Sequence, residues 1–80
     1  MNATAIYRKL RTLIAESLGV EEEEVTPEAS FEEDLNVDQH ELMDLMVAIE
    51  EEFEVPIADD ALGKITTVGD VVEYLEDALA

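Results

Sequence analysis

The residues best suited to chemistry lie together at positions 38–41, where the chain's one histidine stands among acids and an amide. His40 could donate a hydrogen bond to a partner or join Asp38 and Glu41 in a weak metal site. An exposed residue at the start of a helix is the simpler interpretation. A catalytic base needs a nucleophile or a pocket partner, and the sequence has no Ser-His-Asp spacing and no glycine-rich loop. We therefore predict that the chain is not an enzyme, and we assign no metal site.

Other nucleophiles are scarce. The chain has no cysteine, which excludes disulfides, thiolate metal sites and cysteine nucleophiles. Ser17 is expected at a helix end and Ser30 in a turn, where a hydroxyl forms local hydrogen bonds. Neither setting indicates a reactive hydroxyl.

The charge balance limits the class of partner. Twenty-two acids and four bases give a formal net charge of −18, and no base lies between positions 16 and 60. Nucleic acids and anionic membranes are polyanions, so neither is an expected partner. Basic protein surfaces or cations are favoured. Arg8, Lys9 and Arg11 are expected on a solvated face, or alternatively as an internal brace against the acids.

No apolar run approaches the length of a membrane span, and the first ten residues lack the hydrophobic core of a signal peptide. The expectation is a soluble, cytoplasmic protein. Eighty residues suffice for one domain with one small core, so we expect a single domain over 1–80 that is a monomer.

The stretch 34–53 is predicted to form one helical segment that positions the residues at 38–41, and a cap at Asp38 would limit the helix itself to about 38–53. Asp38 is a suitable N-cap, and Glu41 three residues later completes a capping box. Apolar residues at helical spacing predict a buried stripe, formed by Leu42, Leu45, Met46, Ile49 and Phe53. Acids occupy the opposite face and favour docking of a basic partner, namely Glu41, Asp44, Glu51 and Glu52.

Two further helices and one short helical turn complete the prediction. The first helix covers 2–18, with Asn2 or Thr4 as its cap and Gly19 just beyond its end. A long loop over 19–37 is expected to pack through Val20, Val25, Phe31 and Leu35. A short helical turn follows at 59–64, and Thr66 or Thr67 is the expected cap of the last helix, with Asp70 three residues after Thr67. Apolar stripes are predicted in the first helix at Ile6, Leu10, Leu13, Ile14 and Leu18, and in the last helix at Val68, Val71, Val72, Leu75 and Leu79. The fold class is therefore a small all-α bundle of three main helices plus one short helix, with relative directions that periodicity leaves open.

The order of several short motifs resembles that of the acyl carrier protein family. They include Val25-Thr26-Pro27, Ser30-Phe31 and Asp34-Leu35 in the loop. The resemblance continues through residues 48–53 and ends with residues 64–68 and Tyr74. It implies an acyl-carrier-protein-like fold over nearly the whole chain.

In that family a serine at the start of the second helix carries 4′-phosphopantetheine, and the acyl chain is attached to the thiol of this arm. The resemblance implies a role in fatty acid or related acyl-chain biosynthesis. By position, it places the docking of basic enzyme surfaces on Asp38, His40, Glu41, Asp44, Glu50 and Glu51. It places the cavity for the acyl chain at Phe31, Met46, Ile49, Leu62, Ile65 and Val71.

The sequence departs from the family pattern at the attachment position. The family's usual Asp-Ser-Leu is Asp38-Gln39-His40 here. A carboxamide has no hydroxyl to attack the pyrophosphate of coenzyme A, so we expect Gln39 to stay unmodified and predict no cofactor. A lost or changed function accounts for two adjacent departures, and an engineered block of attachment remains the other explanation.

The leading hypothesis is an acyl-carrier-like module that docks basic enzymes of acyl-chain biosynthesis without carrying a chain. A true carrier in a disabled or atypical form is the alternative. A non-covalent binder of cations or of a lipid is a third hypothesis from a different class.

Overall fold

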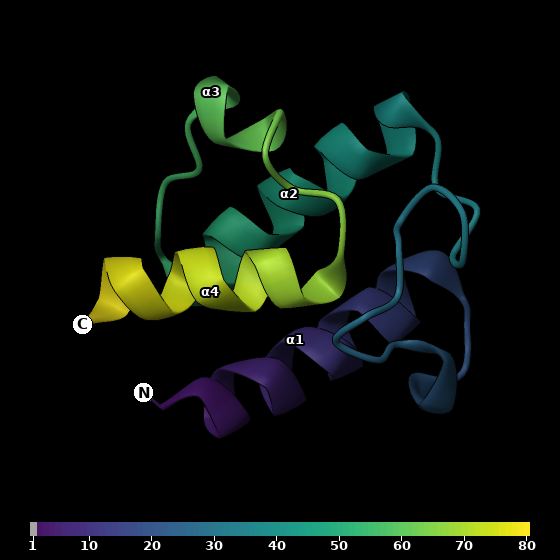
Figure 1. Cartoon of the computed structure of the whole chain (residues 1–80), viewed down its shortest axis with the longest axis horizontal. Helices are drawn as coiled ribbons and strands as arrows, with labels where there is room; N and C mark the ends of the chain where they lie inside the picture. The colour runs from purple at the N-terminus through teal and green to yellow at the C-terminus, as the bar shows by residue number, and fades with distance from the viewer. Residues whose placement is uncertain (1) are drawn as a thin grey trace.

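The computed structural model describes residues 2–80, and over that range the chain folds into helices joined by loops (Figure 1). The predicted all-α class is confirmed, and the only strand-like pairing in this range is an isolated bridge between Ser30 and Thr67. The elements are α1 (Ala3–Leu18), the 3₁₀ turn η1 (Glu22–Glu24), α2 (Gln39–Phe53), α3 (Asp59–Leu62) and α4 (Val68–Leu79).

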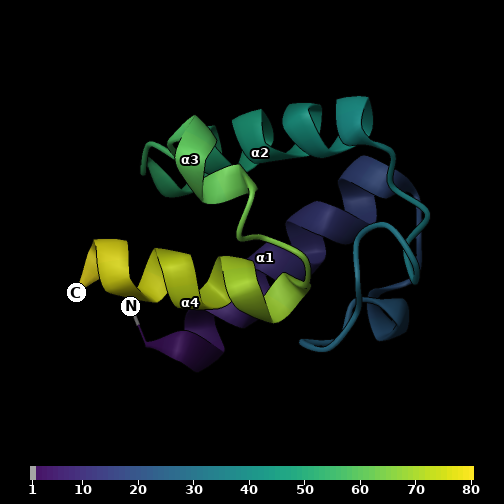
Figure 2. The same ribbon diagram turned by 45° about the horizontal axis from the view of Figure 1, so that its top comes forward.

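Helix α1 is the element on which the bundle is assembled. It packs against both α4 and α2, and α3 lies on the opposite side of the bundle (Figures 1 and 2). The start of α1 and the end of α4 lie at the same end of the molecule. The long first loop, coloured blue to teal, closes the other end. Helices α1 and α4 therefore run in opposite directions, which the sequence left open.

The ends of α1 follow local signals in the sequence. The Asn2 side chain accepts a hydrogen bond from the Ala5 N–H at 2.8 Å, so Asn2 rather than Thr4 is the cap. Gly19 ends the helix in the left-handed conformation at φ 69°, where a side chain would be strained.

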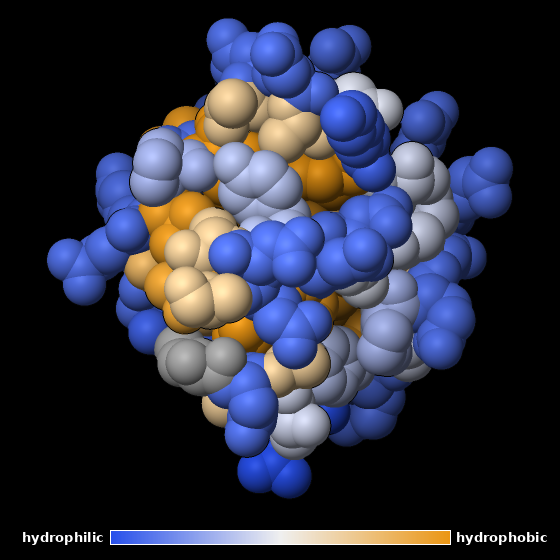
Figure 3. All heavy atoms as spheres, turned by 60° about the vertical axis from the view of Figure 1, so that its left-hand side comes forward, coloured by the Kyte–Doolittle hydropathy of each residue, from blue (hydrophilic) through white to orange (hydrophobic). Residues whose placement is uncertain are grey.

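The core draws on all three long helices and on the loop. Buried side chains from α1, α2 and α4 follow the predicted apolar stripes, and Phe31 and Leu35 of the loop pack among them as expected. Leu42, Val72 and Leu79 lie at the edge of the core and are half-buried. Figure 3 views the termini side, where hydrophilic side chains cover most of the surface and apolar patches show between them.

The predicted helix is wrong over 34–37, whereas the start at about 38 that the Asp38 cap implied is confirmed, since α2 begins at Gln39. Asp34 belongs to a turn in which its carboxylate accepts the Ser30 N–H at 2.7 Å. Asn36 adopts a left-handed conformation at φ 55°, which interrupts any helix. The Val37 N–H donates to the carbonyl of Phe31 at 2.7 Å instead of to a helical partner. The cap prediction at Asp38 is confirmed.

Two of the three basic residues of α1 form ion pairs, whereas Arg8 is exposed and forms none with an acid of residues 2–80. Lys9 Nζ lies 3.7 Å from the Glu52 carboxylate and 5.0 Å from the centre of the Phe53 ring. Arg11 Nε lies 3.3 Å from the Glu22 carboxylate. The brace interpretation therefore holds for Lys9 and Arg11, which join α1 to α2 and to η1. The acidic face that the sequence indicated is accordingly neutralised in part at Glu52.

No helix within residues 2–80 is long and apolar enough to cross a membrane.

Candidate functional site

The start of α2 is held by two reciprocal hydrogen bonds. The Glu41 N–H donates to Asp38 Oδ1 at 2.8 Å, and the Asp38 N–H donates to Glu41 Oε1 at 3.2 Å. This arrangement occupies two backbone donors that a helix start otherwise leaves open. It fixes Gln39, the first residue of the helix, at the protein surface.

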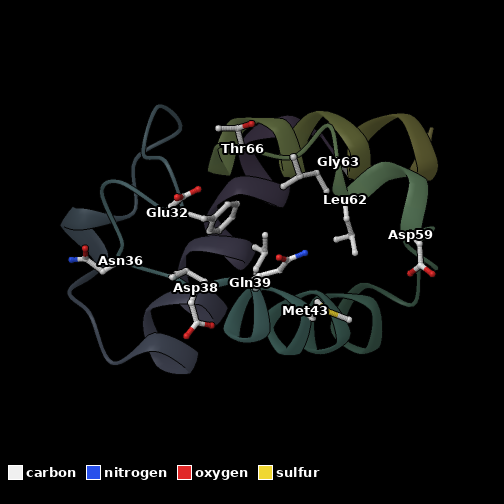
Figure 4. Close-up of a pocket in the computed structure, with 13 residues that line it drawn as sticks. Glu32, Asn36, Asp38, Gln39, Met43, Asp59, Leu62, Gly63 and Thr66 are labelled. Atoms are coloured by element: carbon white, nitrogen blue, oxygen red, sulfur yellow. The ribbon is translucent and has the colours of Figure 1, made fainter.

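A groove of about 900 Å³ runs beside Gln39, between the end of the first loop, α2 and the α3 segment (Figure 4). Its apolar lining residues are Phe31, Val37, Leu42, Met43, Leu62 and Ile65. Its charged lining residues are Glu32, Asp38 and Asp59, which are exposed. The groove therefore combines an apolar floor with an acidic rim.

The residues predicted to line an acyl cavity fall into two groups. Phe31, Leu62 and Ile65 line the groove. The other three, Met46, Ile49 and Val71, are buried in the core and do not line the groove. Sequence reasoning missed the contributions of Glu32 and Asp59 to the rim, because they are distant in sequence and only folding brings them to one groove.

The predicted docking residues of α2 differ in their exposure and in their hydrogen bonds. His40, Asp44 and Glu51 are exposed, and His40 Nε2 lies 3.8 Å from the Asp44 carboxylate one turn later. Asp38 and Glu41 are also exposed, but their side chains form the cap. Glu50 is only partly exposed.

Two large apolar side chains lie among these acids. Met43, which lies off the predicted apolar stripe of this helix, is 51% exposed. Val47 is 54% exposed, and sequence reasoning missed it as a surface residue. The signal was its spacing, since it follows Met43 by four residues and so lies one turn further along the same face. We use the term outer face for His40, Met43, Asp44, Val47 and Glu51.

A family model described as the phosphopantetheine attachment site matches residues 8–75, which is most of the chain. The chain belongs to this family. A solved structure of the acyl carrier protein from Enterococcus faecalis, described for its high thermal stability, is similar over 98% of this chain and 99% of that one. The two are 29% identical in sequence and superpose with a TM-score of 0.79. The predicted acyl-carrier-protein-like fold is confirmed.

This member of the phosphopantetheine attachment family offers no assembled metal site in the part of the chain that the structure describes. No group of three or more His, Cys, Asp or Glu side chains is placed to hold an ion among residues 2–80. His40, Asp38 and Glu41 are adjacent in sequence, but Asp38 and Glu41 bond to each other's backbone instead. The alternative of a weak metal site at these three residues therefore receives no support from the geometry.

The family's prosthetic group needs an alcohol for attachment, and the start of α2 does not supply one. Gln39 carries a carboxamide, and His40 follows it. Ser30 is 9% exposed, and its hydroxyl oxygen accepts the Glu33 N–H at 3.2 Å in a turn. Ser17 is exposed on α1, close to the end of that helix. Residues 38–41, at the start of α2, therefore contain no hydroxyl to which phosphopantetheine could be attached.

Proposed function

We propose that this protein is a non-catalytic acyl-carrier-like module that docks basic enzymes of acyl-chain biosynthesis through α2 and carries no phosphopantetheine. Acyl carrier proteins are carriers rather than catalysts, and they interact with biosynthetic enzymes. Membership of the family supports the general role, and Gln39 supports the loss of attachment.

The observation that carries the docking role is the composition of the outer face. Met43 and Val47 expose apolar surface on the same face as Asp44 and Glu51, and neither acid forms an ion pair with a lysine or arginine of residues 2–80. Burial of such apolar side chains stabilises a complex, whereas exposed rim charges chiefly raise the association rate. A partner surface with an apolar centre and lysine or arginine around it would be complementary.

The docking test is a titration of a carrier-dependent acyltransferase or synthase against wild type and Asp44→Lys/Glu51→Lys at two salt concentrations. We expect the double variant to lose binding, and wild-type affinity to fall between low and physiological salt. The control is Glu16→Lys/Glu76→Lys, which makes the same charge change at exposed positions on α1 and α4. Equal binding by both double variants would contradict docking through the outer face.

Attachment is tested by intact-mass analysis after incubation with coenzyme A and a broad-specificity phosphopantetheinyl transferase. We expect no change of mass for wild type. A gain of one arm at any residue would favour the alternative, a true carrier of atypical form. The variant Gln39→Ser/His40→Leu is expected to accept the arm if the transferase still recognises the rest of α2.

A further inference from the structure

His40 is the chain's one histidine, and it lies on the outer face at the start of α2. Its side chain is 85% exposed, so no other element covers the imidazole. Asp44, Val47 and Glu51 follow His40 by four, seven and eleven residues, spacings that place all four side chains on one stripe of the helix. The apolar and acidic surface proposed for docking therefore includes one side chain that can change its charge near neutral pH.

The charged groups next to His40 on α2 are acids. Its Nε2 lies 3.8 Å from the carboxylate of Asp44, which is 74% exposed. Glu41 follows His40 directly, but its carboxylate accepts an N–H in the cap of α2. No ion pair joins His40 to an acid of another element within residues 2–80, and Lys9, which α1 directs at α2, pairs with Glu52 at the far end of the helix. Protonation of the ring would therefore place a cation beside Asp44, with no second base near it.

The charge of the outer face depends on this one ring. With a neutral imidazole the outer face carries two negative charges, on Asp44 and Glu51, and protonation of His40 reduces its net charge to one negative charge. Histidine ordinarily changes its charge between about pH 5 and 8, whereas ordinary carboxylates titrate near about pH 4 and stay ionised in mild acid. A modest fall in pH can therefore change the outer face while leaving its acids charged.

We propose that His40 makes docking through the outer face pH-dependent: a basic partner binds while the imidazole is neutral and is released in mild acid, when the protonated ring pairs with Asp44 and repels the partner's lysine or arginine side chains. The inference rests on the proposed docking function and goes further in naming the residue that regulates it. Because protonation opposes binding, affinity falls as the pH falls, and by linkage the binding of the partner releases protons from His40.

The test is a titration of the same acyltransferase or synthase against wild type, His40→Gln and His40→Arg at about pH 7.5 and about pH 5.5, on either side of the ordinary histidine range. Glutamine stays neutral and arginine stays charged at both pH values, so the variants represent the two states of the ring. From the higher to the lower pH, we expect the affinity of His40→Gln relative to wild type to rise about threefold, the scale of one partly screened charge.

The affinity of His40→Arg relative to wild type should rise by the same factor, because wild type approaches the charged variant in mild acid. Groups that titrate on the enzyme affect all three proteins alike, so the ratios at each pH are the relevant quantities. Ratios that stay constant between the two pH values would overturn the proposal.

Proton release gives a second readout that a purely structural role of His40 would not change. It is measured by calorimetry of the same complex in two buffers of different ionisation enthalpy, near about pH 6.5, in the middle of the ordinary histidine range. We expect wild type to release a larger fraction of a proton on binding than His40→Gln does. Equal release by the two proteins would overturn the proposal.

A control separates the outer face from the general field of a protein with a charge of −18. Ala78→Arg adds one positive charge at an exposed position near the end of α4. At the higher pH we expect His40→Arg to weaken binding several-fold more than Ala78→Arg does, and equal losses would assign the effect to net charge and overturn the proposal. An enzyme that binds wild type with constant ratios at both pH values would refute only the regulation by His40. An enzyme that binds at neither pH would refute the docking function as well.

Discussion

Helices α2 and α4 begin with the same local motif and use it differently. Asp38 and Glu41 form a capping box at the start of α2, and Thr67 and Asp70 form one at the start of α4. In α4, Thr67 Oγ1 accepts the Asp70 N–H at 3.2 Å, while Asp70 accepts the Thr67 N–H at 3.0 Å. Each box satisfies backbone donors that have no partner within the helix.

The difference lies in what surrounds each start. At α4 the first loop is bonded directly to the helix: the Val68 N–H donates to Ala29 O at 3.1 Å, and the Gly69 N–H to Pro27 O at 2.8 Å. The Phe31 N–H donates to Thr66 O at 3.1 Å just before the helix. We call these three bonds the loop seam. The start of α2 instead faces the groove. At α4 the capping box therefore lies where the loop is bonded to the helix, whereas at α2 it leaves the Gln39 side chain exposed.

The largest expected effect comes from Gly69, at the centre of the loop seam. A Cβ at this position would lie 2.9 Å from the Pro27 carbonyl oxygen, so Gly69→Val should force the loop away from α4. We expect a loss of about 1–3 kcal/mol in unfolding free energy, measured by urea denaturation. The control is Gly63→Ala beside the groove, where the nearest such atom is 3.8 Å away and a change within about 0.5 kcal/mol is expected. Equal unfolding free energies for Gly69→Val and Gly63→Ala would contradict a stabilising role for the loop seam.

A smaller, pH-dependent effect is expected at Asp70. The Thr66 and Thr67 N–H groups donate to its carboxylate at 2.9 and 3.0 Å and hold the pKa of Asp70 below its ordinary value of 3.8. Because this pKa is lower in the folded state, the stabilisation is fully present above pH 3.8 and is lost as the pH falls through the folded value. Asp70→Asn should therefore cost about 1 kcal/mol at neutral pH, on the scale of a lost cap, and almost nothing in strong acid.

Urea denaturation of wild type and Asp70→Asn at both pH values checks this expectation. The difference between the two proteins is the relevant quantity, since protonation of the other acids changes both alike. A difference that stays constant with pH would show that the Asp70 charge makes no contribution.

The next effect concerns Lys9, which ties α1 to the far end of α2. Its ion pair with Glu52 is exposed, and its ammonium lies over the Phe53 ring. Lys9→Gln should cost about 0.5 kcal/mol at low salt, and the cost should shrink at 1 M salt, where the Debye length is about 3 Å. The Gly69→Val cost should stay unchanged by salt, because it arises from packing. Thermal melts at the two salt concentrations separate the two cases.

The smallest expected effect is at Gln39. Its side chain is exposed and makes no hydrogen bond within residues 2–80, so Gln39→Ala should change the unfolding free energy by less than about 0.5 kcal/mol. The substitution leaves the backbone bonds of the α2 cap in place. A loss as large as that of Gly69→Val, in the same urea titration, would mean that the start of α2 is a structural joint like that of α4.

The sequence alone determined the features that depend on neighbours three or four residues apart. The caps at Asp38 and Thr67, the stop at Gly19 and the apolar stripes were all predicted, because hydrogen bonds and helical faces at this spacing follow from residue types in order. The same reasoning failed at residues 34–37, where the Asp34 carboxylate and the left-handed Asn36 favour a turn over the helix.

Only the tertiary structure decided which distant residues meet. The acids of the groove rim, Glu32 and Asp59, come from different segments, and Lys9 reaches Glu52 across more than half of the chain. Such contacts depend on how the helices cross and on where the loop is bonded, and residue spacing carries no information on either. The six residues predicted to line an acyl cavity fall into two groups for the same reason. Helical packing buries Met46, Ile49 and Val71 in the core. Phe31, Leu62 and Ile65 line the groove.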